Sequence, residues 1–211
     1  FLVRKILVNK DLKAGDFNFI LTPGGSAGYS GSSPSEDELA SLAYSADQAQ
    51  PMPTVIYGEN DTAQAVEPDE NGNIVVGNGP SGHVTFDGIK FTAEQAGKVY
   101  KYTIREEIPA EAEYDETLGQ YVLNGVAYSG KEVDLYIHVY IEETDPDTTG
   151  STGSVVRAQV YGERGAAFVN TYSGSLTLRK TVTGVNGDQS RDWRFTVTLT
   201  DKNGHPLSTT V

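Results

Sequence analysis

Three polar residues on stretches far apart in the sequence form the set that amide formation between side chains requires. Lys5 lies in the first apolar stretch of the chain, Glu106 ends a middle stretch, and Asn170 lies in the last stretch before residue 174. Taken singly, each is an ordinary polar residue near a strand end, and most strand lysines face solvent. The combination on a first, a middle and a last strand suggests an intramolecular cross-link.

The strand pattern decides which residues of the set can meet. The nearby strand residues Val3, Ile6 and Val8 are apolar, so the burial of Lys5 depends on which face of the strand it shares. Glu107 is an alternative to Glu106, but adjacent strand residues point to opposite faces, so only one of them can share the buried face. The spacing to Tyr102 and Ile104 favours Glu106.

The elements that must position these residues are predicted to be strands. Glycine is abundant at 23 residues and tyrosine reaches 12, which is typical of strands separated by turns. Asn-Gly pairs at 71–72, 78–79, 124–125 and 203–204 supply turn residues that tolerate a positive φ. Apolar and polar positions alternate over 1–8, 16–21, 83–91, 99–104, 133–141, 155–161, 176–182 and 193–199. This pattern favours a β-sandwich over a barrel.

One stretch, residues 23–53, is rich in Gly, Ser and Pro and interrupts the strands. Within it Ser35 and Glu38 have the spacing of a capping box, which predicts a helix that starts there. Two interpretations remain open: a short helix over an open edge or end of the sandwich, or a surface insertion without fixed structure. The expected buried face of the helix consists of Leu39, Leu42, Ala43 and Ala46.

A partial repeat predicts the domain organisation. Residues 2–5 followed by 16–19 read Leu-Val-Arg-Lys and Asp-Phe-Asn-Phe, and residues 177–180 followed by 192–195 read Thr-Leu-Arg-Lys and Asp-Trp-Arg-Phe. The shared order is a hydrophobic strand, a lysine, a loop and an Asp-aromatic-x-Phe group. We therefore expect a complete domain over 1–173 and, from 174 to 211, the N-terminal strands of a second, truncated domain of the same type.

Composition argues against several classes of partner and site. Sixteen basic residues against 29 acidic ones leave a net charge of -13, which disfavours nucleic acid and anionic membrane surfaces as partners. The absence of cysteine excludes disulfides, thiolate metal sites and cysteine nucleophiles. No apolar run is long enough to span a bilayer, so no membrane insertion is expected in this segment.

Metal binding and turnover catalysis are not predicted. Asp69, Asn71 and Asn73 resemble the start of an EF-hand loop, but no glutamate closes it and a β-turn explains them better. A second acidic group, Asp145 and Asp147, is the other weak calcium candidate. The three histidines are scattered, and no Ser-His-Asp order or phosphate loop is present. The expected metal and cofactor content is none.

Three ordered motifs together resemble one family. They are residues 2–5 with 15–19, residues 97–106, and residues 167–172 leading into 175–180. The chain resembles the isopeptide-containing pilin domains of Gram-positive surface pili, including streptococcal-type major pilin subunits and related adhesin stalk domains. The resemblance implies an all-β, Ig-like or Cna-B-like sandwich with a loop and short-helix insertion, followed by the start of a similar domain.

The resemblance also implies roles for the residues. Lys5 would be the amine nucleophile, Asn170 the acyl donor and Glu106 the catalytic proton carrier. Burial would favour a neutral Lys5 and a protonated Glu106 that hydrogen-bonds the Asn170 carboxamide oxygen. Lys180 would begin the matching bond of the second domain, with its glutamate and asparagine partners expected beyond Val211.

The function implied is that of an extracellular, cell-wall-anchored stalk module that resists force and proteolysis and cross-links itself once, without turnover. Implied partners are other pilin or adhesin subunits, joined via sortase, and a host surface ligand. One departure is that residues 161–166 contain no lysine for sortase, and no Leu-Pro-x-Thr-Gly signal is present. An alternative is a ligand-binding adhesin head that uses residues 23–53 or the acidic loop 142–147.

Overall fold

The computed structural model describes residues 1–144, 153–174, 179–183, 192, 194–198, 200 and 205. The chain divides into two units, Phe1–Gly174 and Ser175–Val211. The strands expected at 176–182 and 193–199 fall partly outside the described residues, and the described residues within those ranges form no strand. The architecture below is that of the first unit.

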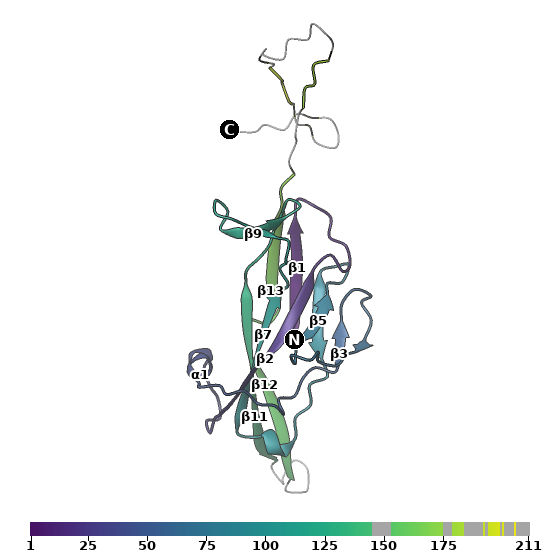
Figure 1. Cartoon of the computed structure of the whole chain (residues 1–211). Coiled ribbons are helices and arrows are strands. Elements are labelled where there is room, and N and C mark those ends of the chain that lie inside the picture. Colours follow the sequence, from purple (N-terminus) through teal and green to yellow (C-terminus); the bar gives the residue numbers. More distant parts are fainter. Residues whose placement is uncertain are drawn as a thin grey trace. The chain divides into compact units, whose positions relative to one another are not determined.

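Two sheets form the first unit, as the strands in Figure 1 show. The larger sheet, sheet A, has the order β4 (Gln64–Ala65), β3 (Val55–Tyr57), β6 (His83–Asp87), β1 (Leu2–Val8), β13 (Ala166–Tyr172), β10 (Val126–Ala127), β9 (Gln120–Leu123), β8 (Glu113–Asp115). Sheet B has the order β12 (Gly153–Gly162), β11 (Glu132–Thr144), β7 (Lys98–Glu106), β2 (Asn18–Gly28), β5 (Ile74–Gly77). The predicted β-sandwich is confirmed.

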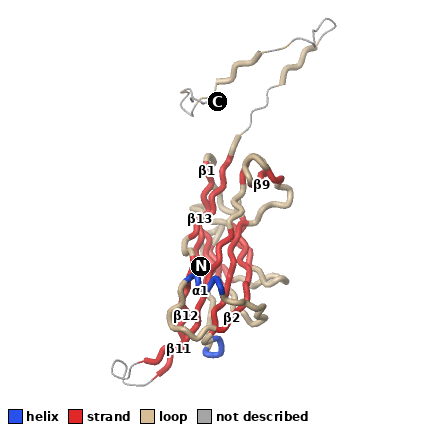
Figure 2. Tube along the Cα trace, turned by 90° about the vertical axis from the view of Figure 1, so that its left-hand side faces the viewer, coloured by secondary structure: helices blue, strands red, loops and turns tan. Residues whose placement is uncertain are grey.

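The first and last strands of the unit are neighbours. β1 pairs with β13 in parallel, with Lys5 opposite Phe168 and Leu7 opposite Asn170, and Figure 2 shows the two strands next to each other. On its other side β1 pairs with β6 in antiparallel register. One face of β1 packs on the core and the other faces solvent, so its first four residues alternate between exposed and buried.

The core lies between the sheets and is filled by alternate residues of the long strands. On β7 these are Tyr100, Tyr102 and Ile104, and on β11 they are Leu135 and Ile137, all nearly inaccessible to solvent. Glu106 continues the same alternation on β7, because it stands two residues beyond Ile104. A strand whose inner face is otherwise apolar thus carries one carboxyl group into the core.

The insertion forms a short helix that lies on a sheet face. Helix α1 (Glu36–Ser41) has Ser35 as N-cap and a complete capping box with Glu38, as the sequence predicts. Leu39 packs on Val99 and Tyr136, which belong to the face of sheet B away from the core. The helix therefore covers a face rather than an edge or end.

Two details of the insertion differ from expectation. Residues 23–28 belong to β2, which continues past a bulge between Pro23 and Ser26, so the insertion starts later than predicted. The helix ends at Ser41, because Leu42 already has extended backbone angles. Ala43 and Ala46 consequently lie beyond the helix and are exposed.

The Asn-Gly pairs behave in different ways. Asn124 and Gly125 both have positive φ, at 51° and 79°, and form the tight turn between β9 and β10, as expected. Asn78, in contrast, is fully buried and uses its side chain for hydrogen bonds. The pair 203–204 lies outside the described residues.

Six of the alternating stretches are strands, with shifted ends. The one predicted at 83–91 ends at Asp87, since Gly88 turns the chain with φ of 76°. Within the described residues, none of the helices has the length and apolar character needed to cross a membrane.

Candidate functional site

Lys5 is buried in the middle of the sandwich. It lies on β1 between β6 and β13, and its residue is 1% exposed. Alternation along β1 gives Lys5 the same inward direction as Val3, which is fully buried. An amine in this position has lost almost all of its contact with water, so it needs a partner within the protein.

Glu106 is that partner. It is the last residue of β7, 2% exposed, and its Oε1 lies 2.7 Å from Lys5 Nζ. The neighbouring Glu107 is exposed and accepts a hydrogen bond of 2.8 Å from Asn18 Nδ2. Of the two glutamates, only Glu106 shares the inner face with Lys5.

Asn170 completes the group from sheet A, across the core from Glu106 in sheet B. It lies on β13, is fully buried, and its Nδ2 donates to Glu106 Oε1 at 2.9 Å. Its Oδ1 accepts from the backbone N–H of Ser129 at 2.7 Å. Because a backbone N–H can only donate, the carboxamide atom that faces it must be the oxygen.

This orientation differs from one expectation. The sequence interpretation has protonated Glu106 bonded to the Asn170 oxygen, whereas Glu106 contacts the nitrogen and Ser129 contacts the oxygen. The physical reason is the position of Ser129, where the chain leaves β10 for sheet B and its N–H is free of the ladder with β13. The carboxamide turns its acceptor towards this fixed donor.

Burial favours the uncharged forms of the lysine and the glutamate. Desolvation lowers the pKa of Lys5 from 10.5 to about 8, against the attraction of Glu106, which acts to raise it. Desolvation likewise raises the pKa of Glu106, although Lys5 and Asn170 both act to lower it. Since loss of water is the larger effect at each residue, burial shifts both groups towards their neutral forms.

Aromatic side chains enclose the three groups. The Phe17 ring centroid lies 4.3 Å from Lys5 Nζ. Phe19 and Phe168 meet edge to face with centroids 5.1 Å apart, one ring from each sheet. Phe17 also contacts Tyr128 at 5.9 Å between centroids. An aromatic ring, that of Phe17, thus lies against the amine.

Sequence reasoning finds neither the contribution of Ser129 to the site nor the burial of Asn78. Ser129 acts through its backbone, which leaves no signal in the sequence. Asn78 resembles an ordinary turn residue because glycine follows it, yet it is fully buried. No sequence signal could have identified the burial of Asn78, since an exposed and a buried Asn-Gly pair look alike in the sequence.

Lys180 lies in the second unit and is exposed. Its role as the lysine of a second bond stays a prediction.

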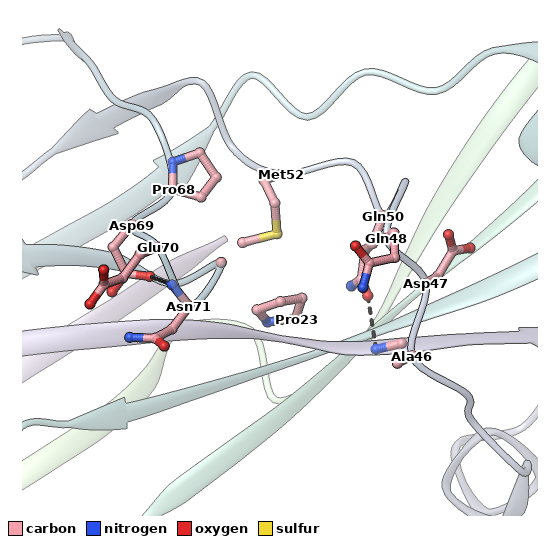
Figure 3. A pocket seen from close by; sticks show the side chains of 12 residues that line it. Pro23, Ala46, Asp47, Gln48, Gln50, Met52, Pro68, Asp69, Glu70 and Asn71 are labelled. Carbon is pink, nitrogen blue, oxygen red and sulfur yellow. Dashed lines mark hydrogen bonds between the residues drawn. The ribbon is translucent and has the colours of Figure 1, made fainter.

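A hollow of the first unit lies elsewhere, beside the insertion. It has a volume of about 520 Å³ and lies between β2, residues 46–52 and the turn at 68–72 (Figure 3). Gln50, which lines the hollow, bonds the backbone at two points. Its Oε1 accepts from the Gly25 N–H at 2.8 Å, and its Nε2 donates to the Lys101 carbonyl at 2.7 Å. None of the three site residues lines this hollow.

The candidate calcium residues form a turn. Asp69 Oδ1 accepts from the backbone N–H groups of Asn71 and Asn73, both at 2.8 Å. Asp145 and Asp147 lie outside the described residues. Over the described part of the chain, no group of three or more His, Cys, Asp or Glu side chains is arranged to hold a metal ion.

Comparison with known proteins yields two family matches. Residues 1–173 match the FctA model, described as a Spy0128-like isopeptide containing domain. Residues 174–211 match the model of a domain of unknown function, DUF7601. Comparisons with curated proteins and with solved structures gave no match.

Proposed function

Because the chain belongs to the family of Spy0128-like isopeptide containing domains, we propose that Lys5 and Asn170 form an intramolecular isopeptide bond with the help of Glu106. The family is one of pilin domains, which are structural rather than catalytic. Membership implies a location at the cell surface or outside the cell, and pilus components as partners.

One observation carries the proposal. Glu106 Oε1 contacts Lys5 Nζ at 2.7 Å and Asn170 Nδ2 at 2.9 Å, so the amine and the leaving nitrogen meet at the same carboxyl oxygen. An oxygen in this place can accept a proton from one nitrogen and deliver one to the other. The opposed sheets hold the three groups in place before reaction, which lowers the entropic part of the barrier.

The reaction can be written with every atom assigned. The neutral Lys5 amine attacks Cγ of Asn170, and the bond Nζ–Cγ forms while the carboxamide oxygen takes up negative charge. The Ser129 N–H already donates to this oxygen at 2.7 Å and stabilises that charge. The proton of the attacking nitrogen passes to Glu106, and a proton from Glu106 passes to Nδ2. The bond Cγ–Nδ2 then breaks and releases ammonia.

The bond would serve a stalk that bears load. β1 and β13 lie side by side and parallel, so a pull between the two ends of the unit acts along this strand pair. A covalent link between them carries force without extension of the domain. We propose that the domain is a stalk module of a pilus or adhesin that contributes to attachment to a host or surface.

The test is the intact mass of the purified chain. One isopeptide bond lowers the mass by one ammonia, about 17 Da. Lys5→Ala and Asn170→Ala, which each remove one of the two joined groups, should have the mass of their sequence. A wild-type chain at its full sequence mass would refute the proposed bond.

The hollow beside the insertion favours a second candidate, a ligand-binding head. Its walls come partly from residues 46–52, which belong to the stretch that the sequence singles out for binding. Against it, Gln50 and Asp69 already bond groups of the chain itself. Screening against glycans and matrix proteins tests this candidate, because a stalk module should bind none of them well.

A further inference from the structure

A loop closes the proposed bond-forming site at one end. Residues 9–17 connect β1 in sheet A with β2 in sheet B, and most of their side chains are exposed. Phe17 is the exception: it is 6% exposed, and its ring lies 4.3 Å from Lys5 Nζ. Within this loop, Phe17 is the residue that contacts the amine.

Two open hollows are lined in part by Phe17. One, of about 230 Å³, lies towards Leu7 and Leu123, and the other, of about 300 Å³, lies towards Pro109. Phe17 and Tyr128 line both of them, and their rings meet at 5.9 Å. The aromatic pair is therefore a wall between water outside and the buried amine inside.

Asn78 fixes the backbone of Phe17 through hydrogen bonds. Phe17 and Asn78 stand opposite each other where the β2–β5 ladder ends, and the Asn78 N–H donates to the Phe17 carbonyl at 2.9 Å. The Asn78 carbonyl accepts from Gly15 instead of Phe17, at 2.8 Å. The side-chain oxygen of Asn78 replaces the Asn78 carbonyl as the acceptor of the Phe17 N–H, at 2.8 Å.

The remaining atoms of the Asn78 side chain fix the loop further. Its Nδ2 donates to the Lys13 carbonyl at 2.9 Å and to the Gly79 carbonyl at 2.8 Å. The fully buried amide of Asn78 thus bonds backbone groups of Phe17, Lys13 and Gly79.

The same turn also holds the strand that carries the amine. Gly82 closes the turn that begins at Gly79, and its carbonyl accepts from the Lys5 N–H at 2.7 Å. Gly82 has φ of 84°, and a Cβ there would collide with the Lys5 carbonyl oxygen. One short turn, residues 78–82, is therefore bonded both to the lysine and to the residue that covers it.

We infer, on the premise of the proposed isopeptide bond, that Asn78 is a positioning residue that holds Phe17 over the Lys5 amine and keeps water out of the bond-forming site. The titratable groups that face the amine and the ring that covers it are Glu106 from β7, with Oε1 2.7 Å from Lys5 Nζ, and Tyr128, whose ring meets that of Phe17. Phe17 also contacts the ammonium form through its ring face, which favours the charged lysine. Exclusion of water acts in the other direction and is the larger effect on Lys5.

The inference predicts a specific pH dependence. When the loop no longer covers the site, water reaches Lys5 and its pKa moves from about 8 back towards 10.5. The fraction of neutral amine at neutral pH then falls by about 10-fold or more, and the rate of bond formation falls with it. Raising the pH restores part of the neutral amine and so part of the rate. A general loss of folding would instead slow the reaction at every pH.

The experiment follows bond formation in newly made chains. The full chain is synthesised without cells, transferred to buffers from about pH 6 to about pH 9.5, and quenched in acid at intervals. The intact mass then gives the fraction that has lost ammonia. The variants are Asn78→Ala, Phe17→Ala and Phe17→Leu, and Asn78→Ser replaces the alanine variant if that one does not fold.

Gln50→Ala is the matched control. Gln50 is also a buried amide, 8% exposed, that bonds backbone groups at both ends, but it lies beside the insertion (Figure 3). We expect Asn78→Ala and Phe17→Ala to be slowed about 10-fold or more at neutral pH and to recover in part at high pH. Phe17→Leu, which keeps an apolar side chain over the amine, should be slowed less than Phe17→Ala, and Gln50→Ala should stay close to wild type.

Two results would overturn the inference while leaving the bond itself intact. In one, the Asn78 variant forms the bond at the wild-type rate at every pH. In the other, it is slowed by the same factor at every pH, as a merely structural residue would be. If the wild-type chain itself loses no ammonia, the proposed bond fails and the inference falls with it.

Discussion

Glu106 and Asn170 meet across the interior of the sandwich, where Asn170 Nδ2 donates to Glu106 Oε1 at 2.9 Å. Glu106 belongs to sheet B and Asn170 to sheet A, so this contact joins the two layers at a buried point. Lys5 reaches the same oxygen from β1, the strand that pairs with the β13 strand of Asn170. The chemistry proposed for the domain therefore depends on the packing of one sheet on the other.

Glu106→Gln should abolish the bond, because a glutamine cannot carry the proton between the two nitrogens. The expected mass is that of the sequence, with no loss of about 17 Da. Glu107→Gln is the matched control: Glu107 is adjacent but exposed, so this variant should still lose one ammonia. Intact mass of both variants checks the prediction, and a cross-linked Glu106→Gln chain would remove Glu106 from the mechanism.

Loss of the bond should lower stability substantially. The ring closed between positions 5 and 170 contains nearly the whole first unit, and the loop-entropy argument gives about 5 kcal/mol of stabilisation. Asn170→Ala should therefore unfold at much lower denaturant concentration than wild type. Equilibrium unfolding in guanidinium measures the difference. Glu107→Gln, which keeps the bond, should unfold with wild type, and equal midpoints for wild type and Asn170→Ala would contradict the prediction.

A chain that cannot cross-link should become more stable as the pH rises above about 8. In Asn170→Ala, Lys5 remains a titrating amine, and burial lowers its folded pKa to about 8 from 10.5. Between these values the unfolded chain binds more protons than the folded one, so the free energy of unfolding rises with pH, by about 3 kcal/mol at most. Below about 8 this gain is absent.

Wild type is the control for that pH profile, because an amide nitrogen does not titrate in this range. Urea unfolding of both chains from about pH 7 to about pH 10 compares the two slopes. A flat profile for Asn170→Ala would mean that Lys5 is not desolvated in the folded state.

Force applied between the ends of the first unit should not extend wild type. The parallel pair β1 and β13 is loaded along its length, and the bond would carry the load past all residues between 5 and 170. Asn170→Ala should instead unfold with a gain of on the order of 500 Å in contour length. Single-molecule pulling distinguishes the two, and a full-length extension of wild type would contradict the stalk function.

The helix in the insertion should matter for stability but not for the bond. Leu39 is fully buried against sheet B, so Leu39→Ala should cost about 2–5 kcal/mol. The same variant should still lose one ammonia, since α1 lies on the face of sheet B away from Glu106. Ala43→Ser, at an exposed position beyond the helix, should change stability by less than about 0.5 kcal/mol. Thermal unfolding and intact mass together check both parts.

Local sequence patterns predict the long strands and the start of the helix. Alternation identifies β1, β7 and β11, because the pleat of a strand fixes which residues share a face. The capping box of Ser35 and Glu38 is a local hydrogen-bond pattern, so it is visible in the sequence and present in the structure. The short strands β3, β4, β8 and β10 carry too few residues to show any period.

The sequence by itself determined that Lys5, Glu106 and Asn170 form one candidate set, since strand alternation puts Glu106 rather than Glu107 on the inner face. Only the tertiary structure decided which atoms meet. The pairing of β1 with β13 and the packing of the two sheets bring the amine and the carboxamide to one carboxyl oxygen. The backbone N–H of Ser129 and the buried amide of Asn78 act through contacts between distant segments, which no local pattern encodes.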